Sequence, residues 1–372
     1  MKFPIQKLKA LIQPDNIKKL YSKYEPYWSP VAMAAGFIFD NLTLRRVDLL
    51  AENLVIIIYL AAVLGLIFYL TAYEHGRLKK ELLIKIARIS PYALQFFFGG
   101  LFSAFLVFYR RSASITSSWP FLLILASMLI DNELFRQRYQ RLTFRLTIYF
   151  IAIFSYSVFA VPIIFNELGT KMFLLSGLVS ILLLIIIVLL AKKITPQGVS
   201  QGKKSLLISV ASIYILFNFL YFTNIIPPIP LALKDLMVAH SVKRVAQGYE
   251  VKFEPAPWYQ FWRQENSVIN WKSGAPIYIY SAIFAPTDIN AKIFHRWYYR
   301  NETIGKWQEK SLLGFEISGG TDRGYRGYSL KYQLQAGRWR VEVVNERGQI
   351  LGRTKFEIVE TSELPNLKTV LK

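Results

Sequence analysis

The chain has 372 residues, a formal net charge of +21 and a hydrophobic content of 53%. It contains no cysteine, which excludes disulfide bonds, thiolate metal sites and lipidation of a cysteine. A strongly basic chain can bind nucleic acid. Here most of the basic excess lies in the apolar first part of the chain, where membrane topology accounts for it, so we predict no nucleic-acid partner.

Residues 1–26 form a polar, lysine-rich segment that precedes the first apolar run. Its apolar side chains recur at helical spacing at Ile5, Leu8, Leu11 and Ile12. This pattern predicts a basic amphipathic segment that lies on an anionic inner leaflet. A solvated basic leader is the alternative interpretation.

Residues 27–224 predict a transmembrane bundle of about seven helices, because a bilayer core of about 30 Å requires roughly 20 apolar residues per helix. Whether Tyr27–Phe39 fully spans is left open, since it is short and flanked by Glu25 and Asp40. The other predicted spans are Leu54–Ala72, Ile89–Tyr109, Ile115–Ile130, Leu146–Phe165, Met172–Ala191 and Ser205–Phe222.

The positive charges between these spans predict their orientation. With seven spans and a cytoplasmic N-terminus, nineteen lysines and arginines fall on the inside and five on the outside. We therefore predict a multi-pass protein of a bacterial inner membrane whose C-terminal domain is periplasmic. The spans carry no charge near their centres, which argues against an ion-coupled transporter.

The remainder of the chain predicts an all-β domain. Residues 225–248 are interpreted as a proline-rich connector, residues 249–360 as a periplasmic β-sandwich and residues 361–372 as a C-terminal tail. Alternating short runs indicate an immunoglobulin-like sandwich with Trp297, Trp307 and Trp339 in its core. The seven strand candidates are Tyr249–Phe253, Ile277–Phe284, Ile293–Tyr299, Leu313–Ile317, Tyr328–Leu334, Trp339–Val343 and Ile350–Ile358.

Four short motifs in this domain resemble a known family. They are His-Arg-Trp-Tyr at 295–298, Ile-Ser-Gly-Gly at 317–320, Gly-Tyr-Arg-Gly-Tyr-Ser at 324–329 and Gly-Arg-Trp-Arg-Val at 337–341. Together they resemble the bacterial family classed as domain of unknown function 2914. The resemblance implies a membrane anchor followed by a β-sandwich, and it implies no activity.

A glycine-rich stretch at residues 319–327 is the candidate ligand site. The glycines, among them Gly320 and Gly324, expose backbone N–H groups, and Arg323 and Arg326 add positive charge. Such a loop suits an anion: a carboxylate, a phosphate or an acidic glycan. The alternative is a long turn whose arginines pair with nearby acids.

His295 is added to the candidate ligand residues, although a lone histidine among aromatic residues is more often part of a core. No cysteine or second histidine lies near it in the sequence, so no metal site is predicted. No catalytic residue and no cofactor are predicted either.

The preferred functional interpretation is a membrane protein that presents its sandwich as a binding or scaffold module. Its partners would be the lipid bilayer and a protein or a cell-envelope component, and the interpretation includes no enzymatic reaction. The alternative is an enzyme or carrier that acts on a lipid-linked substrate at the outer face of the inner membrane. A small-solute transporter is the third interpretation.

Overall fold

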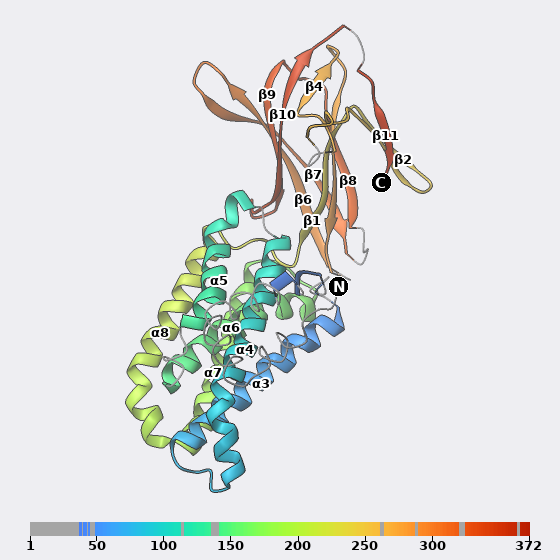
Figure 1. Ribbon diagram of the computed structural model, residues 1–372. Coiled ribbons are helices and arrows are strands. Elements are labelled where there is room, and N and C mark those ends of the chain that lie inside the picture. Colours follow the sequence, from blue (N-terminus) through green and yellow to red (C-terminus); the bar gives the residue numbers. More distant parts are fainter. Residues whose placement is uncertain are drawn as a thin grey trace, which may run out of the picture.

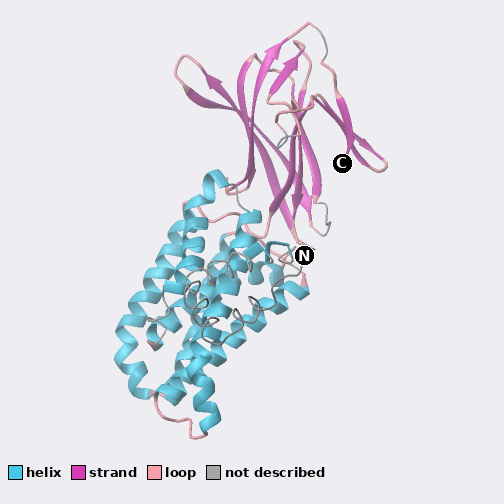
Figure 2. Cartoon of the chain, in the orientation of Figure 1, coloured by secondary structure: helices cyan, strands magenta, loops and turns pink. Residues whose placement is uncertain are grey.

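The computed structural model describes residues 37–38, 40–42, 44, 49–112, 115–134, 141–260, 264–286, 289–319, 324–362 and 365–372. Helices form the first part of the chain and strands form the second (Figure 1). The two parts meet end to end, as Figure 2 shows. The predicted amphipathic segment 1–26 and most of Tyr27–Phe39 lie outside the described residues.

Helices α3 to α8, called the bundle here, cover the predicted spans. They are α3 (Leu50–Glu74), α4 (Glu81–Ser112), α5 (Ile115–Leu134), α6 (Leu142–Phe165), α7 (Thr170–Ile194) and α8 (Pro196–Phe222). Within the described residues, five helices are long and apolar enough to cross a membrane: α3, the Ser90–Ser112 part of α4, α6, α7 and α8. The predicted span Ile115–Ile130 falls in α5, which has a shorter apolar stretch at Ser118–Met128.

The bundle is packed around α6 and is apolar on its outside as well. Phe150 and Phe154 of α6 are fully buried, and the Phe154 ring stacks on Phe217 of α8 with 4.7 Å between centroids. Leu182 and Ile186 of α7 point outward and are about half exposed, at 51% and 54%. An apolar surface of this kind is consistent with a multi-pass membrane protein.

Polar contacts close the end of the bundle that lies away from the strands. The buried guanidinium of Arg145 at the start of α6 donates to the carboxylate of Glu74 at the end of α3. His75 Nε2 lies 2.7 Å from Thr195 Oγ1, which also accepts a hydrogen bond from the backbone of Gly198 at the start of α8. These contacts connect α3, α6 and α8, and pairing makes the buried charge tolerable.

Strands β1 to β11, called the module here, form three sheets. Their order is β1–β5–β8, β4–β10–β9–β6–β7 and β11–β3–β2. The strands are β1 (Ala232–Ala239), β2 (Ser241–Val245), β3 (Gly248–Phe253), β4 (Val268–Trp271), β5 (Ile277–Phe284), β6 (Asn290–Asn301), β7 (Lys306–Ser318), β8 (Tyr325–Lys331), β9 (Gly337–Asn345), β10 (Ile350–Glu360) and β11 (Lys368–Leu371).

The three sheets are layered, with β1–β5–β8 in the middle. On one side, Val238 of β1 and Ile279 of β5 share a buried cluster with Trp339 of β9 in the five-stranded sheet. On the other side, Met237 of β1 shares a second buried cluster with Val251 of β3. The β11–β3–β2 sheet therefore covers the back of the middle sheet. The all-β part of the fold prediction is confirmed, and the immunoglobulin-like topology stays a prediction.

The strand boundaries differ from the predicted division of the chain. Strands β1 and β2 lie inside the predicted connector 225–248, and β11 lies inside the predicted tail 361–372. Strand β1 has buried residues on both faces and a register shift between Leu233 and Asp235, so its sequence lacks strict alternation. The connector proper is therefore the short proline-containing segment 223–231.

The three predicted core tryptophans divide into two groups. Trp297 and Trp339 are buried, with 0% and 1% exposed. Trp307 lies partly exposed beside Arg340, whose guanidinium carbon is 4.8 Å from the ring centroid. Because the register pairs Trp307 with Arg300, its side chain lies on the same face as Arg340, outside the layers.

Candidate functional site at the junction of bundle and module

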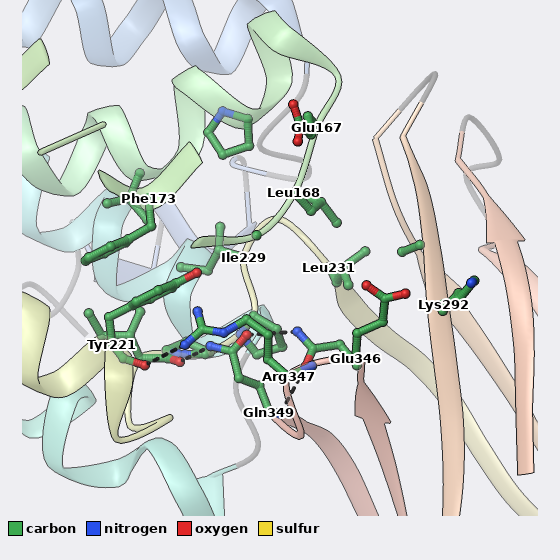
Figure 3. Close-up of a pocket in the computed structure, with 18 of the residues that line it drawn as sticks. Glu167, Leu168, Phe173, Tyr221, Ile229, Leu231, Lys292, Glu346, Arg347 and Gln349 are labelled. Atoms are coloured by element: carbon green, nitrogen blue, oxygen red, sulfur yellow. Dashed lines mark hydrogen bonds between the residues drawn. The ribbon is translucent and has the colours of Figure 1, made fainter. Parts of the chain in front are cut away.

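A cavity of about 240 Å³ lies where the bundle meets the module (Figure 3). Its walls come from α6, the α6–α7 turn, α7, α8, the connector, β6 and the β9–β10 turn. The lining residues include Glu167, Leu168, Phe173, Tyr221, Leu231, Lys292, Asn345, Glu346, Arg347 and Gln349. We call this space the junction cavity.

The α6–α7 turn forms one wall of the junction cavity. Helix α6 is followed by Asn166, whose φ of 53° is left-handed and suits asparagine at a helix end. Gly169, with φ of 114°, immediately precedes α7. Between them, Leu168 packs against an apolar cluster of the module that includes Leu231 and Ile293. This turn therefore brings the bundle into the module's apolar core.

The β9–β10 turn forms the opposite wall and projects Arg347 toward the bundle. Asn345 Oδ1 accepts hydrogen bonds from the backbone N–H groups of Arg347 (3.1 Å) and Gln349 (3.0 Å). Gly348 has φ of 75°, a left-handed value that glycine adopts without strain. The asparagine and the glycine thus fix the turn, and Arg347 lies at its tip.

Arg347 completes a stack of side chains against the end of α8. Its guanidinium carbon lies 3.8 Å from the centroid of the Tyr221 ring, a cation–π contact. That ring in turn stacks on Phe173 with 3.7 Å between centroids. Because the carboxyl end of a helix carries partial negative charge, the position also favours a cation. Figure 3 shows Arg347 reaching toward Tyr221 at the end of α8.

Two further hydrogen bonds join the β9–β10 turn to the connector that follows α8. Asn224 Nδ2 donates to the backbone oxygen of Arg347 (3.3 Å), and Gln349 Nε2 donates to that of Ile226 (3.0 Å). Within the described part of the chain, Arg347 Nη1 and Asn224 Oδ1 are buried without a hydrogen-bond partner. Such atoms cost free energy, so the junction is close-packed but incompletely bonded.

Charged side chains gather at the mouth of the junction cavity. Glu167, Lys292 and Glu346 are exposed there, whereas Phe173 and Tyr221 line the inner part. This arrangement suits a ligand with one polar and one apolar part. Within the described residues, no group of three or more histidine, cysteine, aspartate and glutamate side chains is placed to hold a metal ion.

His295, a predicted ligand residue, lies in the core of the module instead of in the junction cavity. It is fully buried, with Nε2 2.9 Å from Ser281 Oγ and Nδ1 2.8 Å from Ser329 Oγ. Trp297 Nε1 donates to the same Ser329 hydroxyl (3.2 Å). Burial lowers the pKa of His295 to about 3, which keeps the ring neutral. The imidazole therefore serves as a packed and hydrogen-bonded core group.

The predicted glycine-rich site is described only in its second half. Gly320 and Arg323 lie outside the described residues. Gly324 has φ of 80°, and a Cβ there would lie within 2.9 Å of the Ile283 backbone, so close approach of β5 requires a glycine. Arg326 Nη1 donates to the backbone oxygen of Lys372 (2.9 Å). Neither Gly324 nor Arg326 lines the junction cavity.

Sequence reasoning did not find the residues of the junction. Tyr221, Asn224 and Arg347 carry no motif, and Tyr221 and Arg347 are 126 positions apart. The Asn-Glu-Arg-Gly turn at 345–348 was visible as a turn, but nothing in it indicated what the arginine contacts. The available signal was a cation at the tip of a tight turn.

The strands that form one wall of the cavity lie in the part of the chain that matches a family model. Residues 290–358 match the family model DUF2914, described as a protein of unknown function. This match confirms the resemblance predicted from the motifs. It extends from the start of β6 into β10 and includes the β9–β10 turn with Arg347. No curated protein matches the chain.

Three solved structures show a distant likeness to the chain. A β-glucosidase from Listeria innocua is 11% identical over 33% of this chain, which spans 16% of that enzyme's length, with a TM-score of 0.19. An immunoglobulin-like protein from Pseudomonas aeruginosa is 10% identical over 34% of this chain and 97% of its own, also with a TM-score of 0.19. The alkylpurine DNA glycosylase AlkC from Pseudomonas fluorescens is 13% identical over 80% of this chain and 76% of its own, with a TM-score of 0.22. These scores are too low to support an argument about fold or function.

Proposed function

We propose that this is an integral protein of a bacterial inner membrane that presents the module on the periplasmic side as a binding or scaffold unit. The N-terminus lies in the cytoplasm, and the module has an immunoglobulin-like architecture. Five apolar helices support the membrane part of the proposal, and the distribution of lysines and arginines supports its orientation.

The observation that carries the proposal is the way the module is fixed to the bundle. Contacts through Arg347, Gln349 and Leu168 hold it at the end of the helices, beyond the covalent connection through the connector. A flexible tether would need none of these contacts. A fixed module keeps one orientation relative to the bilayer, which is what a scaffold or a membrane-bound receptor requires.

The junction cavity favours a second function, an enzyme or carrier acting on a lipid-linked substrate. Its mouth is charged and its inner part is aromatic, and it lies at the end of the apolar helices. A lipid-linked molecule has a polar headgroup and an apolar chain, which match the charged mouth and the aromatic inner part of the cavity. In that case the charged residues Glu167 and Glu346 at the mouth would contact the headgroup.

Reporter fusions test the proposed orientation. Alkaline phosphatase fused after Lys372 is expected to be active, because the enzyme requires export, and a green fluorescent protein fused there is expected to be dark. The same reporters inserted after Gly76, in the α3–α4 turn, are expected to give the opposite result. The reversed pattern at both positions would refute the orientation and with it the periplasmic module.

Native mass spectrometry of the full chain in detergent separates the two functions. A retained lipid-linked molecule that is lost in the double variant Glu167→Gln, Glu346→Gln would favour the enzyme or carrier. Exposed Glu357 and Glu360 at the far end of β10 provide the matched control, the double variant Glu357→Gln, Glu360→Gln. Absence of such a molecule from the wild type, with the fold intact, would favour the binding module.

A further inference from the structure

The two outer faces of the module differ in how far other strands cover them. The back of the middle sheet is covered by β11–β3–β2, whereas the outside of β6, β9 and β10 has exposed side chains at its far end, at Arg338, Lys355 and Glu357. Alternation along these three strands puts basic and aromatic side chains on that outside. We call it the basic face and define it by Arg296, Tyr298, Arg300, Arg338, Arg340, Arg353 and Lys355.

Cations lie next to one another across the strands of the basic face. The register pairs Arg340 of β9 with Lys355 of β10. It also pairs Tyr299 with Trp339, so Arg300 and Arg338 occupy neighbouring positions on the two strands. Like charges at such positions destabilise a sheet. A sequence that retains them against their cost in stability is typical of a functional surface.

Some of these cations are held in place by their neighbours. The Arg340 guanidinium carbon lies 4.2 Å from the Tyr298 ring centroid and 4.8 Å from that of Trp307. Arg353 contacts one carboxylate oxygen of buried Glu342 through both Nε (2.8 Å) and Nη2 (2.6 Å). Side chains ordered in advance lose little entropy when they bind a partner.

Other cations of the basic face are exposed and can contact a ligand. Arg338 and Lys355 are exposed, and within the described residues neither has an ion-pair partner. Glu357 lies opposite Arg338 in the register but is not within ion-pair distance. Arg300 has a distant contact, 3.9 Å from Glu302. The surplus of positive charge is therefore greatest around Arg300, Arg338 and Lys355.

The position of this surplus excludes the host membrane as its partner. Arg347 at the junction and Arg338 lie at opposite ends of β9 and its turn, roughly 30 Å apart at about 3.3 Å per residue. Figure 1 shows the strands of this sheet running from the bundle to the far end of the module. Exposed charges are screened beyond about 8 Å in physiological salt, so lipid headgroups at the bundle are out of reach.

We propose that the basic face binds a polyanionic polysaccharide, a linear sugar polymer that carries carboxylates. Arg338 and Arg340 are two residues apart on one strand, about 7 Å, and Lys355 and Arg300 lie beside them on the neighbouring strands, which presents a cluster of cations to a charged polymer. Tyr298 and Trp307 are occupied by Arg340, so they offer no stacking platform for nucleobases. The proposal rests on the proposed function, because it names the partner class of the binding module.

Binding of a labelled polygalacturonate to the full chain in an uncharged maltoside detergent tests this proposal. Fluorescence anisotropy is expected to show binding that weakens as salt rises, with no binding of neutral dextran. The double variant Arg338→Gln, Lys355→Gln is expected to lower the affinity at least tenfold. The matched control Lys243→Gln, Arg244→Gln removes the same charge from exposed positions on β2, and we expect it to bind like the wild type.

Three results would overturn the proposal. They are no binding of polygalacturonate, an equal loss in the control variant, or preferential binding of poly-glutamate, which would indicate an acidic protein instead. Melting temperatures that do not fall in either variant ensure that a loss of binding reflects the surface. The reporter fusions test the proposed function independently. If they give the expected pattern and polygalacturonate does not bind, the proposed ligand class is wrong, but the proposal of a membrane-bound module is unaffected.

Discussion

The bundle and the module distribute their apolar side chains in opposite ways. On α7 of the bundle, Leu182, Ile185 and Leu189 are about half exposed, at 51%, 49% and 58%. On β9 of the module, Trp339 and Val341 are sealed inside, while the alternate positions carry charge. The first pattern requires apolar surroundings and the second requires water.

This difference separates the two parts as folding units as well. The helices of the bundle bury a shared aromatic core and present apolar surface outward. The module has three buried clusters of its own, and Leu168 of the α6–α7 turn reaches one of them. The module should therefore fold in water without the bundle, provided that all its layers are present.

The largest effect is expected from removing the strand shared by two cores. A fragment of residues 225–372, exported to the periplasm, should be soluble and β-rich by circular dichroism. A fragment that starts at Ser241 lacks β1, so it loses Met237 and Val238 from two different clusters and should be unfolded. Equal folding of the two fragments would show that the module does not need β1.

A second, smaller effect is expected from replacing a buried tryptophan of the five-stranded sheet, compared with a partly exposed one. Trp339→Ala should destabilise the 225–372 fragment by about 3–5 kcal/mol, because the side chain is 1% exposed. Trp307→Ala should cost about 1 kcal/mol, since it mainly removes a cation–π contact with Arg340. Urea denaturation followed by circular dichroism measures both. Similar costs would contradict the assignment of the two faces.

The sequence predicted the elements whose pattern is local. Apolar length identified α3, α6, α7 and α8, and alternation identified β3, β9 and β10. Strand β1 was missed because it is buried on both sides and shifts register at Leu233. Strands β4 and β11 have four residues each, too few to establish a period.

The junction was beyond sequence reasoning for a different reason. Arg347, Tyr221 and Asn224 meet only because α8 and the β9–β10 turn end at the same place. No alternation or motif encodes a contact between residues so distant in the chain. His295 shows the reverse case, a conspicuous residue that the fold places in the core.

His295 also makes the module's stability depend on pH. Burial holds its folded pKa at about 3, below the unfolded value of about 6.5. The unfolded state therefore takes up a proton first, so stability is full above pH 6.5 and is lost as pH falls toward 3. Between pH 7 and pH 5 this group should cost about 2 kcal/mol.

Urea denaturation of the 225–372 fragment at pH 7, 6 and 5 measures this loss. His295→Gln cannot titrate, so its stability should fall less steeply over the same range, although the variant starts lower. Subtracting the two curves removes the contribution of the carboxylates. If the free energy of unfolding falls equally with pH in the wild type and in His295→Gln, the ring is protonated in the folded module and water reaches it.

The smallest effect concerns the contact that joins the two parts. Arg347→Ala removes the stack on Tyr221, a contact of about 1 kcal/mol. The melting temperature of the full chain should fall slightly, measured by intrinsic fluorescence in detergent. The 225–372 fragment lacks Tyr221, so the same substitution should leave its melting temperature unchanged. Arg338→Ala, at an exposed position without an ion-pair partner among the described residues, should not lower the melting temperature of either form. A loss of equal size in the fragment would mean that Arg347 stabilises only its own turn, and that the module is held to the bundle by other contacts.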